Sequence, residues 1–513
     1  MTDRIKISYF ILLSSVLLFF AALKVNGQQI FNGPYLAEPT ENSMTIRWES
    51  RDKVNFTVEY GKSDSYDKKG EATLLGQKEV SFMYEVVLDN LKPGKRYFYR
   101  LMSGSKTISK SSFQLANSKS PLTFAILGDS RSKPKIFSAL TKLINETDPI
   151  AIIANGDIVA KGGSTENWHS QFFTPSATMI NHTPFLSAVG DHESDDVDGD
   201  SAKLFSYYLY PHKNNMKLWF SYDIGNAHFI FLDWRYPYSE EMIDWFKSDI
   251  NSSDKRWKFV VLHRSPYNLG GHHVSWGKNV WPDLFQDNRV DVVFSGHSHL
   301  YERYYPIKPK ETDSSWAVTY ITTGGAGASL AESNIHPSLA YSESVNHFLK
   351  MTIEKERIKI LAIRADGVTI DSVAWEKDKG VISGKYLAKA FSKEEMDVVN
   401  VFNSPLSQRI GGLPMVHVPY QPQISLDGTV VKEEVEYVIR LADESKGKYL
   451  MEPVKGVLKP GTKQGVVLNI YSRTTMTVSK WGALTPVLRL VAEYRTKSFN
   501  GTITGSRLEY IAY

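Results

Sequence analysis

Two histidines one residue apart, His297 and His299, give the clearest chemical signal in this sequence. They follow an apolar run, 290–294, and the glycine Gly296. On an extended backbone the side chains at i and i+2 point to the same side. Each imidazole can then bind a different member of a pair of metal ions. Because an isolated pair of this kind is more often a surface or hydrogen-bonded group, the rest of the chain must supply partners.

Four earlier apolar segments also end in residues that can bind a metal. These segments and the residues that follow them are 123–127 with Asp129, 151–154 with Asp157, 185–189 with Asp191, His192 and Glu193, and 259–262 with His263. Ligands of α/β sheets bind outside the carboxyl ends of the strands. We therefore expect the five strand ends to converge on one site.

The composition limits the kinds of site that this chain can build. The 513 residues include no cysteine, which excludes disulfides, thiolate metal sites and a cysteine nucleophile. A metal must then be bound by nitrogen and oxygen ligands. The net charge of +4 is small for this length, and no basic run indicates a nucleic-acid partner.

The pattern along the chain predicts a multidomain protein. Residues 28–117 alternate in the manner of short strands, and Tyr97 follows a Pro-Gly turn as does the corner tyrosine of immunoglobulin-like and fibronectin type III sandwiches. Strands alternate with helical segments over 121–376, which predicts a central α/β domain. The polar stretch 376–384 is expected to be a linker. Residues 385–513 again have a β pattern, and we expect an immunoglobulin-like accessory domain there.

The first 27 residues have the features of an export signal. Arg4 and Lys6 precede the apolar run 7–23, and small residues follow at 25–27. This pattern predicts a secreted, periplasmic or cell-surface protein. The alternative is an uncleaved membrane anchor, because the apolar run is only slightly shorter than a membrane span requires.

The ordered motifs resemble those of the calcineurin-like metallophosphoesterase superfamily. The preceding sandwich, the segment 261–264 and the run 296–303 look most similar to the purple acid phosphatase branch. The resemblance covers about 29–376 and implies an αββα-type catalytic sandwich. It leaves the C-terminal part unexplained.

The resemblance implies a centre of two metal ions, of iron, manganese or zinc. The first ion would be bound by Asp129, Asp157 and His299, and the second by Asp157, Asp191, His263 and His297. Such a pair activates hydroxide as the nucleophile and stabilises an in-line phosphoryl displacement. His192 would be the general acid that protonates the leaving oxygen. Glu193 would orient its imidazole.

The sequence departs from the family pattern at three positions. Ala160 stands where purple acid phosphatases carry a metal-binding tyrosine. Arg131 stands where relatives without that tyrosine place a histidine, so the first ion keeps three protein ligands. Asp191 replaces the usual asparagine. Arg131 is either a surface residue or a contact to the substrate phosphate.

The resemblance also implies that a histidine of the Gly-rich loop 268–273 contacts the phosphate. His272 and His273 are both candidates, and a solvent-exposed loop is the alternative. We expect a phosphomonoesterase acting on a small phosphoester, with no nucleic-acid partner and no membrane association unless the N-terminal segment is retained. A phosphodiesterase and a non-catalytic surface binding protein with an eroded centre are the alternatives.

Overall fold

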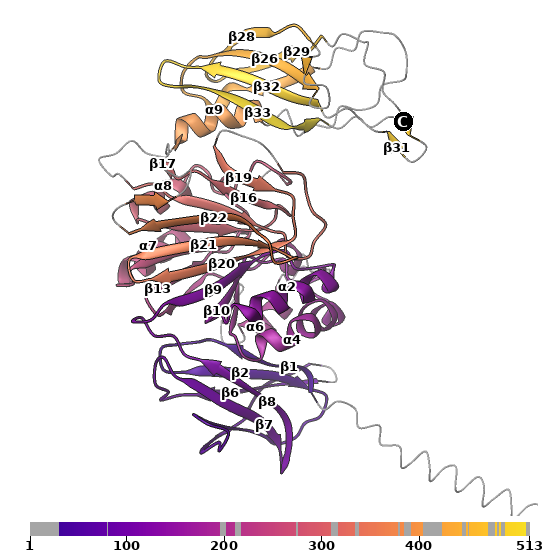
Figure 1. Ribbon diagram of the computed structural model, residues 1–513, viewed down its shortest axis with the longest axis vertical. Coiled ribbons are helices and arrows are strands. Elements are labelled where there is room, and N and C mark those ends of the chain that lie inside the picture. The colour runs from indigo at the N-terminus through magenta and orange to yellow at the C-terminus, as the bar shows by residue number, and fades with distance from the viewer. Residues whose placement is uncertain are drawn as a thin grey trace, which may run out of the picture.

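The computed structural model describes most of the chain, in segments listed here. They are residues 30–78, 81–194, 202–210, 217–272, 275–308, 316–333, 338–377, 380–383, 391–403, 423–443, 448–449, 451–469, 478–479, 482–483 and 488–508. The predicted export signal, 1–27, lies outside them. Within these segments no helix is both long enough and apolar enough to cross a membrane. Three parts follow one another along the long axis of the molecule (Figure 1).

The N-terminal part consists of two four-stranded sheets around a shared apolar core. The first, in spatial order, is β1 (Ile30–Ala37), β2 (Met44–Ser50), β6 (Ser81–Leu88) and β5 (Thr73–Lys78). The second is β4 (Lys68–Glu71), β3 (Phe56–Gly61), β7 (Arg96–Ser103) and β8 (Lys106–Gln114). The hydroxyl of Tyr97 accepts a hydrogen bond from the backbone N–H of Lys92, 2.9 Å away, which ties the turn before β7 to that strand.

Strand β2 is buried on both faces, although its sequence alternates like a half-exposed strand. Its polar face lies against the central domain. The Arg47 Nη1 donates to the carbonyl of Leu209 at 3.0 Å, and the Tyr35 hydroxyl of β1 donates to the carbonyl of Tyr208 at 2.6 Å. Both carbonyls belong to the end of helix α6 (Lys203–Leu209). The N-terminal part therefore helps to hold a helix of the central domain.

The central domain contains two seven-stranded sheets, which we call the first and second central sheets. The first is β11 (Phe185–Ser187), β10 (Ala151–Ala154), β9 (Leu122–Leu127), β20 (His347–Glu354), β21 (Arg357–Arg364), β22 (Thr369–Glu376) and β23 (Gly380–Ser383). Strands β9 to β11 are parallel, and β20 to β23 continue the sheet antiparallel. The predicted linker 376–384 was wrong in part, because β23 within it pairs with β22.

The second central sheet has a parallel core with antiparallel edges. In spatial order it is β12 (Phe220–Ile224), β13 (Ala227–Phe231), β14 (Trp257–Leu262), β15 (Val292–Ser295), β18 (Thr319–Thr323), β16 (Tyr301–Tyr304) and β19 (Leu339–Glu343). Strands β13, β14, β15 and β18 are parallel to one another. Their fully buried, mainly apolar sequences are typical of parallel strands covered on both faces.

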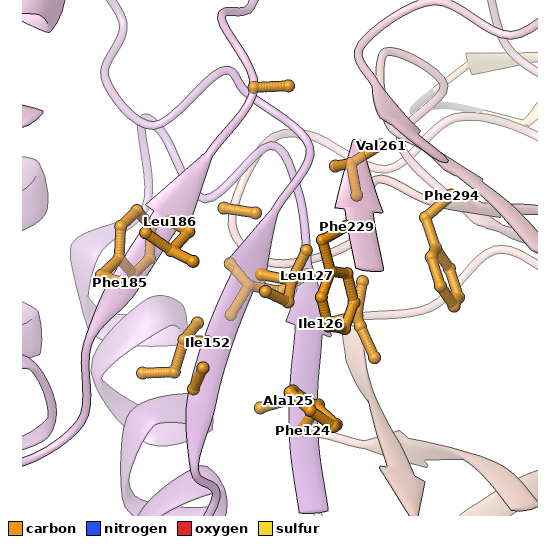
Figure 2. Packing of buried hydrophobic residues seen from close by; sticks show 14 of the residues in the cluster. Phe124, Ala125, Ile126, Leu127, Ile152, Phe185, Leu186, Phe229, Val261 and Phe294 are labelled. Carbon is orange, nitrogen blue, oxygen red and sulfur yellow. The ribbon is translucent and has the colours of Figure 1, made fainter. Parts of the chain in front are cut away.

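The two central sheets pack face to face. Phe124 of β9 contacts Phe229 of β13, with ring centroids 5.0 Å apart. Figure 2 shows side chains of both sheets in this layer, among them Ile126, Val261 and Phe294. Burial of this apolar layer fixes how the two sheets are aligned, so the ends of their parallel strands lie at the same edge of the domain.

Helices cover the outer faces, which gives the four-layered sandwich that the sequence predicted. Over the first central sheet and its loops lie α2 (Pro134–Glu146), α3 (Thr165–Asn167), η1 (Trp168–Phe173), α4 (Thr174–Ile180), α5 (Asp191–Ser194) and α6. Over the second lie α7 (Glu240–Ser252) and α8 (Trp281–Asp287), whose apolar sides join one cluster with β13, β14 and β15.

The C-terminal part has its own apolar core and is joined to the central domain by a short strand pair. That pair is β17 (Ile307–Lys308) with β24 (Phe391–Ser392), and helix α9 (Lys393–Asn403) follows. The remaining elements are β25 (Gln423–Asp427), η3 (Gly428–Val430), β26 (Val435–Asp443), β27 (Lys448–Tyr449), β28 (Val454–Leu458), β29 (Lys463–Val467), β30 (Val478–Ser479), β31 (Gly482–Ala483), β32 (Leu488–Arg495) and β33 (Asn500–Leu508). The predicted β-rich character is confirmed; an immunoglobulin-like topology stays a prediction.

Candidate metal centre

The first central sheet supplies the carboxylates. Asp129 and Asp157 follow β9 and β10, and both have left-handed backbones, with φ of 57° and 54°. Few residues other than glycine adopt this conformation, and aspartate is among those that do so most readily. The turns at both strand ends are tight. A side chain at Gly190 would collide with Asp157, and one at Gly296 with Asp129, so the neighbouring chains approach as only glycine allows.

The second central sheet supplies the imidazoles. His263 follows β14, and His297 and His299 follow β15. The expectation of an extended backbone through this pair was wrong. Strand β15 ends at Ser295, and His297 has a φ of 65°, so the segment is a turn. The turn places His297 beside Asp191 and His299 beside Asp129.

Near the first metal position the ligand atoms lie close together. His299 Nε2 is 3.5 Å from Asp129 Oδ1, and Asp129 Oδ2 accepts the backbone N–H of His297 at 2.9 Å. The Nδ1 of His299 donates to the carbonyl of Ser329 at 2.7 Å. Because this hydrogen bond fixes the tautomer, Nε2 keeps its lone pair and points into the centre.

At the second position, atoms of Asp191, His263 and His297 all lie within 4.8 Å of one another. His297 Nδ1 is 3.0 Å from Asp191 Oδ2, and His263 Nε2 is 3.7 Å from Asp191 Oδ1. His263 Nε2 is also 3.4 Å from Asp157 Oδ1, and atoms of Asp129, Asp157 and His263 likewise lie within 4.8 Å of one another, so Asp157 lies next to both groups. The Nδ1 of His263 donates to the carbonyl of Asn155 at 2.8 Å, which again leaves Nε2 free to bind.

Two observations fit cation binding at these positions. Asp129 Oδ1 and His263 Nε2 are buried and have no hydrogen-bond partner, a costly arrangement unless another ligand satisfies them. Burial and the charge of Asp157 raise the pKa of Asp129 well above its usual value. Burial disfavours a charged His263, yet the carboxylates around it raise its pKa overall. Crowded carboxylates of this kind favour the uptake of positive charge.

Arg131 is not a surface residue. Its Nε donates to Asp157 Oδ2 at 3.0 Å, and its Nη2 donates to His299 Nε2 at 3.2 Å. The guanidinium therefore engages two of the three ligands that the resemblance assigns to the first ion. It would have to release them for that ion to bind with all three.

Arg264 follows His263 in the segment 261–264, and no role was predicted for it from the sequence. Its Nε donates to Asp191 Oδ1 at 2.9 Å and its Nη2 to Asp191 Oδ2 at 2.7 Å. Its guanidinium lies 4.0 Å from the ring centre of Trp234. Burial opposes ionisation of Asp191, but His297, His263 and Arg264 lower its pKa overall. The available signal was Asp191, since a partly buried carboxylate is commonly paired with a positive charge.

His192 stands beside the bridging carboxylate. Its Nε2 is 3.8 Å from Asp157 Oδ2, its Nδ1 donates to the carbonyl of Ala160 at 2.7 Å, and its side chain is 32% exposed. A proton donor needs such access to solvent and substrate. The backbone oxygen of Ala160 therefore holds this ring in place.

Glu193 does not orient His192, contrary to our expectation. Its carboxylate accepts four backbone N–H groups, from Asp157, Ile158, Val159 and Gly190, at 2.7–3.1 Å. Burial raises its pKa to about 8. The carboxyl group is fully used in fixing the loop that presents Asp157, so its neighbour along the chain takes its orientation from Ala160 instead.

His272, of the two loop histidines, faces the centre. Its ring centroid lies 5.1 Å from that of His297 and 5.3 Å from that of His299. Burial and the nearby positive groups lower its pKa, so the neutral ring is favoured. His273 lies outside the described residues. All the other predicted site residues are brought together in this one region.

Comparison with known proteins agrees with this geometry. A family model described as calcineurin-like phosphoesterase matches residues 122–301, and one described as purple acid phosphatase, N-terminal domain, matches 34–115. Purple acid phosphatase 21 of Arabidopsis thaliana is 29% identical over 298 residues, covering 53% of this chain and 66% of that protein. Probable inactive purple acid phosphatase 27 of the same plant is 25% identical and covers 55% of each.

A solved structure shows the same fold. The purple acid phosphatase from yellow lupin (Lupinus luteus) seeds has a TM-score of 0.59 at 21% identity, covering 70% of this chain and 75% of that one. The chain spans about two thirds or less of the length of the two curated relatives named above.

Proposed function

We propose that this chain, which belongs to the calcineurin-like phosphoesterases and carries the N-terminal domain of purple acid phosphatases, hydrolyses small phosphate monoesters. The observation that carries the proposal is the convergence on one edge of Asp129, Asp157, Asp191, His263, His297 and His299, where Asp129 Oδ1 and His263 Nε2 are buried without a hydrogen-bond partner. Such atoms are costly to bury unless another group satisfies them.

The donor set fits two divalent or trivalent ions, of iron, manganese or zinc. Asp129, Asp157 and His299 would hold the first, and Asp157, Asp191, His263 and His297 the second. Bound there, the ions supply Lewis acidity towards phosphate oxygens and an activated water as nucleophile. The metal identity follows from the nitrogen and oxygen ligands only as a class.

The residues of the chain itself have distinct tasks in this reaction. His272 would donate a hydrogen bond to a phosphate oxygen. His192, as the imidazolium, would pass its Nε2 proton to the leaving oxygen while the bond from phosphorus to that oxygen breaks. The carbonyl of Ala160 stabilises that charged ring by accepting from Nδ1. Glu193 keeps Asp157 in place through the backbone.

The N-terminal residues support export as part of this proposal. A protein with the segment 1–27 removed would act in a secreted, periplasmic or cell-surface location on small phosphoesters. Retention of that segment would instead attach the enzyme to a membrane.

A second candidate is a non-catalytic binding protein with an eroded centre. The contacts of Arg131 with Asp157 and His299 favour it, because they occupy groups that a metal needs. His192 opposes it, since erosion would have no reason to preserve a positioned proton donor beside the bridge.

The test compares His192→Ala with the purified protein, loaded in turn with Mn, Zn, Fe and Mg, on aryl phosphate monoesters and diesters. We expect two ions per chain in both proteins and a loss of turnover of roughly 100-fold or more in the variant. The matched control is His182→Ala, a histidine outside the centre, which should retain full turnover. Less than one ion per chain and no turnover with any ion would favour the binding protein; a preference for diesters would identify a phosphodiesterase.

A further inference from the structure

The loop that carries His272 connects β14 to α8 and closes over the metal centre. Its described residues are 263–272 and 275–280. The His272 ring lies over both members of the histidine pair, as the ring distances above show. The position of this loop therefore decides whether a phosphate bound to the centre meets an imidazole.

The first half of the loop is tied to the segment that follows β15. The buried carboxylate of Glu302 accepts the N–H of Gly270 at 2.6 Å and of Leu269 at 3.3 Å. The hydroxyl of Ser298 accepts from Asn268 at 2.5 Å and donates to the carbonyl of Gly270 at 3.0 Å. These bonds lie within the central domain and fix the first half of the loop, and Trp276 in its second half donates to the carbonyl of Trp234 at 2.6 Å.

The second half is tied to the C-terminal part. Lys278 Nζ lies 2.5 Å from Asp397 Oδ1 of α9, and the two side chains are only 12% and 11% exposed. The residue before Asp397, Met396, is fully buried in the apolar cluster that contains Tyr267, Leu269 and Trp276. A largely buried ion pair leaves a costly unpaired charge when one partner is removed.

Helix α9 is anchored on its other side as well. Val398, Val401 and Phe402 belong to the core of the C-terminal part, where the Phe402 ring lies 5.8 Å from that of Tyr437. The strand pair of β17 with β24 holds the start of the helix to the central domain. The helix lies between the two parts (Figure 1) and contributes buried side chains to the cores of both.

We propose that the C-terminal part braces the substrate-facing loop, and that Lys278 and Asp397 are the positioning pair through which it does so. This inference rests on the proposed function insofar as His272 contacts phosphate. The brace itself is a property of the fold and holds for any ligand of the centre. It gives the C-terminal part a role in phosphate recognition although none of its described residues belongs to the centre.

The test uses Asp397→Ala, with Lys432→Ala as matched control. Lys432 forms an exposed ion pair with Glu394 of the same helix, so its loss removes a charge contact without touching the loop. In Asp397→Ala we expect amide hydrogen exchange of the loop to quicken by about tenfold. The metal-loaded protein should also bind inorganic phosphate about fivefold more weakly, with unchanged metal content. In Lys432→Ala neither quantity should change.

Two further variants test the same ion pair in a different way. Lys278→Met removes the same ion pair from the other partner and keeps the aliphatic contact, so it should reproduce both effects if Asp397→Ala folds poorly. The exchanged pair Lys278→Asp with Asp397→Lys should restore part of the phosphate affinity. Unchanged loop exchange in folded Asp397→Ala or Lys278→Met overturns the brace, whatever the catalytic activity. Faster exchange with unchanged phosphate affinity overturns the role in recognition.

Discussion

The two central sheets contribute different chemistry to one site. Strands β9, β10 and β11 of the first end in Asp129, Asp157 and Asp191, whereas β14 and β15 of the second end in histidines. In the proposed centre each metal position draws on both sheets. The first would combine Asp129 and Asp157 with His299, and the second Asp157 and Asp191 with His263 and His297. The centre exists only because the sheets are stacked with their strand ends at the same edge.

The first central sheet mainly supplies negative charge to the centre, and the second mainly supplies ligand atoms of fixed orientation. The carboxylate side carries the negative charge, and its groups respond to burial and to one another. On the imidazole side the ring orientations are set by backbone carbonyls, such as Asn155 behind His263 and Ser329 behind His299. Each side also sends an arginine to the carboxylates: Arg131 reaches Asp157, and Arg264 reaches Asp191 across the gap between the sheets. The charge balance is thus built from both sheets.

The largest effect is expected when a carboxylate shared by both positions is removed. Asp157→Ala deletes the bridge and leaves Arg131 and the His192 backbone without their acceptor. We expect loss of both ions and of at least about 1000-fold in turnover. The matched change on the other sheet, His299→Ala, should cost only the first ion. Metal analysis and turnover measure both; equal losses in the two variants would show that the division between sheets has no functional meaning.

Glu302 is an exception to this division of carboxylates and imidazoles between the sheets, because it is a buried carboxyl of the second sheet. Burial raises its pKa from 4.5 to about 7. The folded protein therefore takes up a proton that the unfolded chain has released, and its stability should fall as the pH rises from about 4.5 to 7. The loss should be at most about 3 kcal/mol. Urea unfolding at pH 5 and pH 8 measures it, and Glu302→Gln should remove this part of the slope; an identical slope in both proteins would contradict the assignment.

Arg131 tests the balance at the first position. Arg131→Ala frees Asp157 Oδ2 and His299 Nε2, so the first ion should bind about tenfold more tightly. Titration with limiting metal, followed by metal analysis, measures this. Arg256→Ala, which removes an exposed arginine paired with Glu356, is the control. Weaker metal binding in Arg131→Ala would show that the guanidinium supports the centre rather than competing with it.

Much of this arrangement could be predicted because it follows from local patterns. The apolar runs before Asp129, Asp157 and His263 have the composition of buried parallel strands, and the rule for strand ends then brings their tips together. The backbone conformation of the turns was harder to predict. The left-handed conformation of His297 cannot be read from its sequence, and so the extended backbone expected there was wrong.

Contacts distant in sequence were not predictable at all. Glu193 lies next to His192 in the chain, yet its carboxylate turns inward to the backbone of 157–159. Arg264 pairs with Asp191 across 73 positions, and Lys278 reaches a helix of another part of the molecule. Such partners are fixed by the stacking of sheets and domains, which no local pattern specifies.

The contacts made by β1 and β2 have a consequence for how the protein unfolds. The final carbonyls of α6 receive their hydrogen bonds from Tyr35 and Arg47, residues of the N-terminal part. Because Arg47 is fully buried there, separating the two parts would expose a guanidinium, a phenol and two carbonyls at once. The helix end is therefore capped by a different domain. The boundary near residue 120 separates two patterns of strands and helices in the sequence, but because the two parts share these buried contacts we expect them to unfold together.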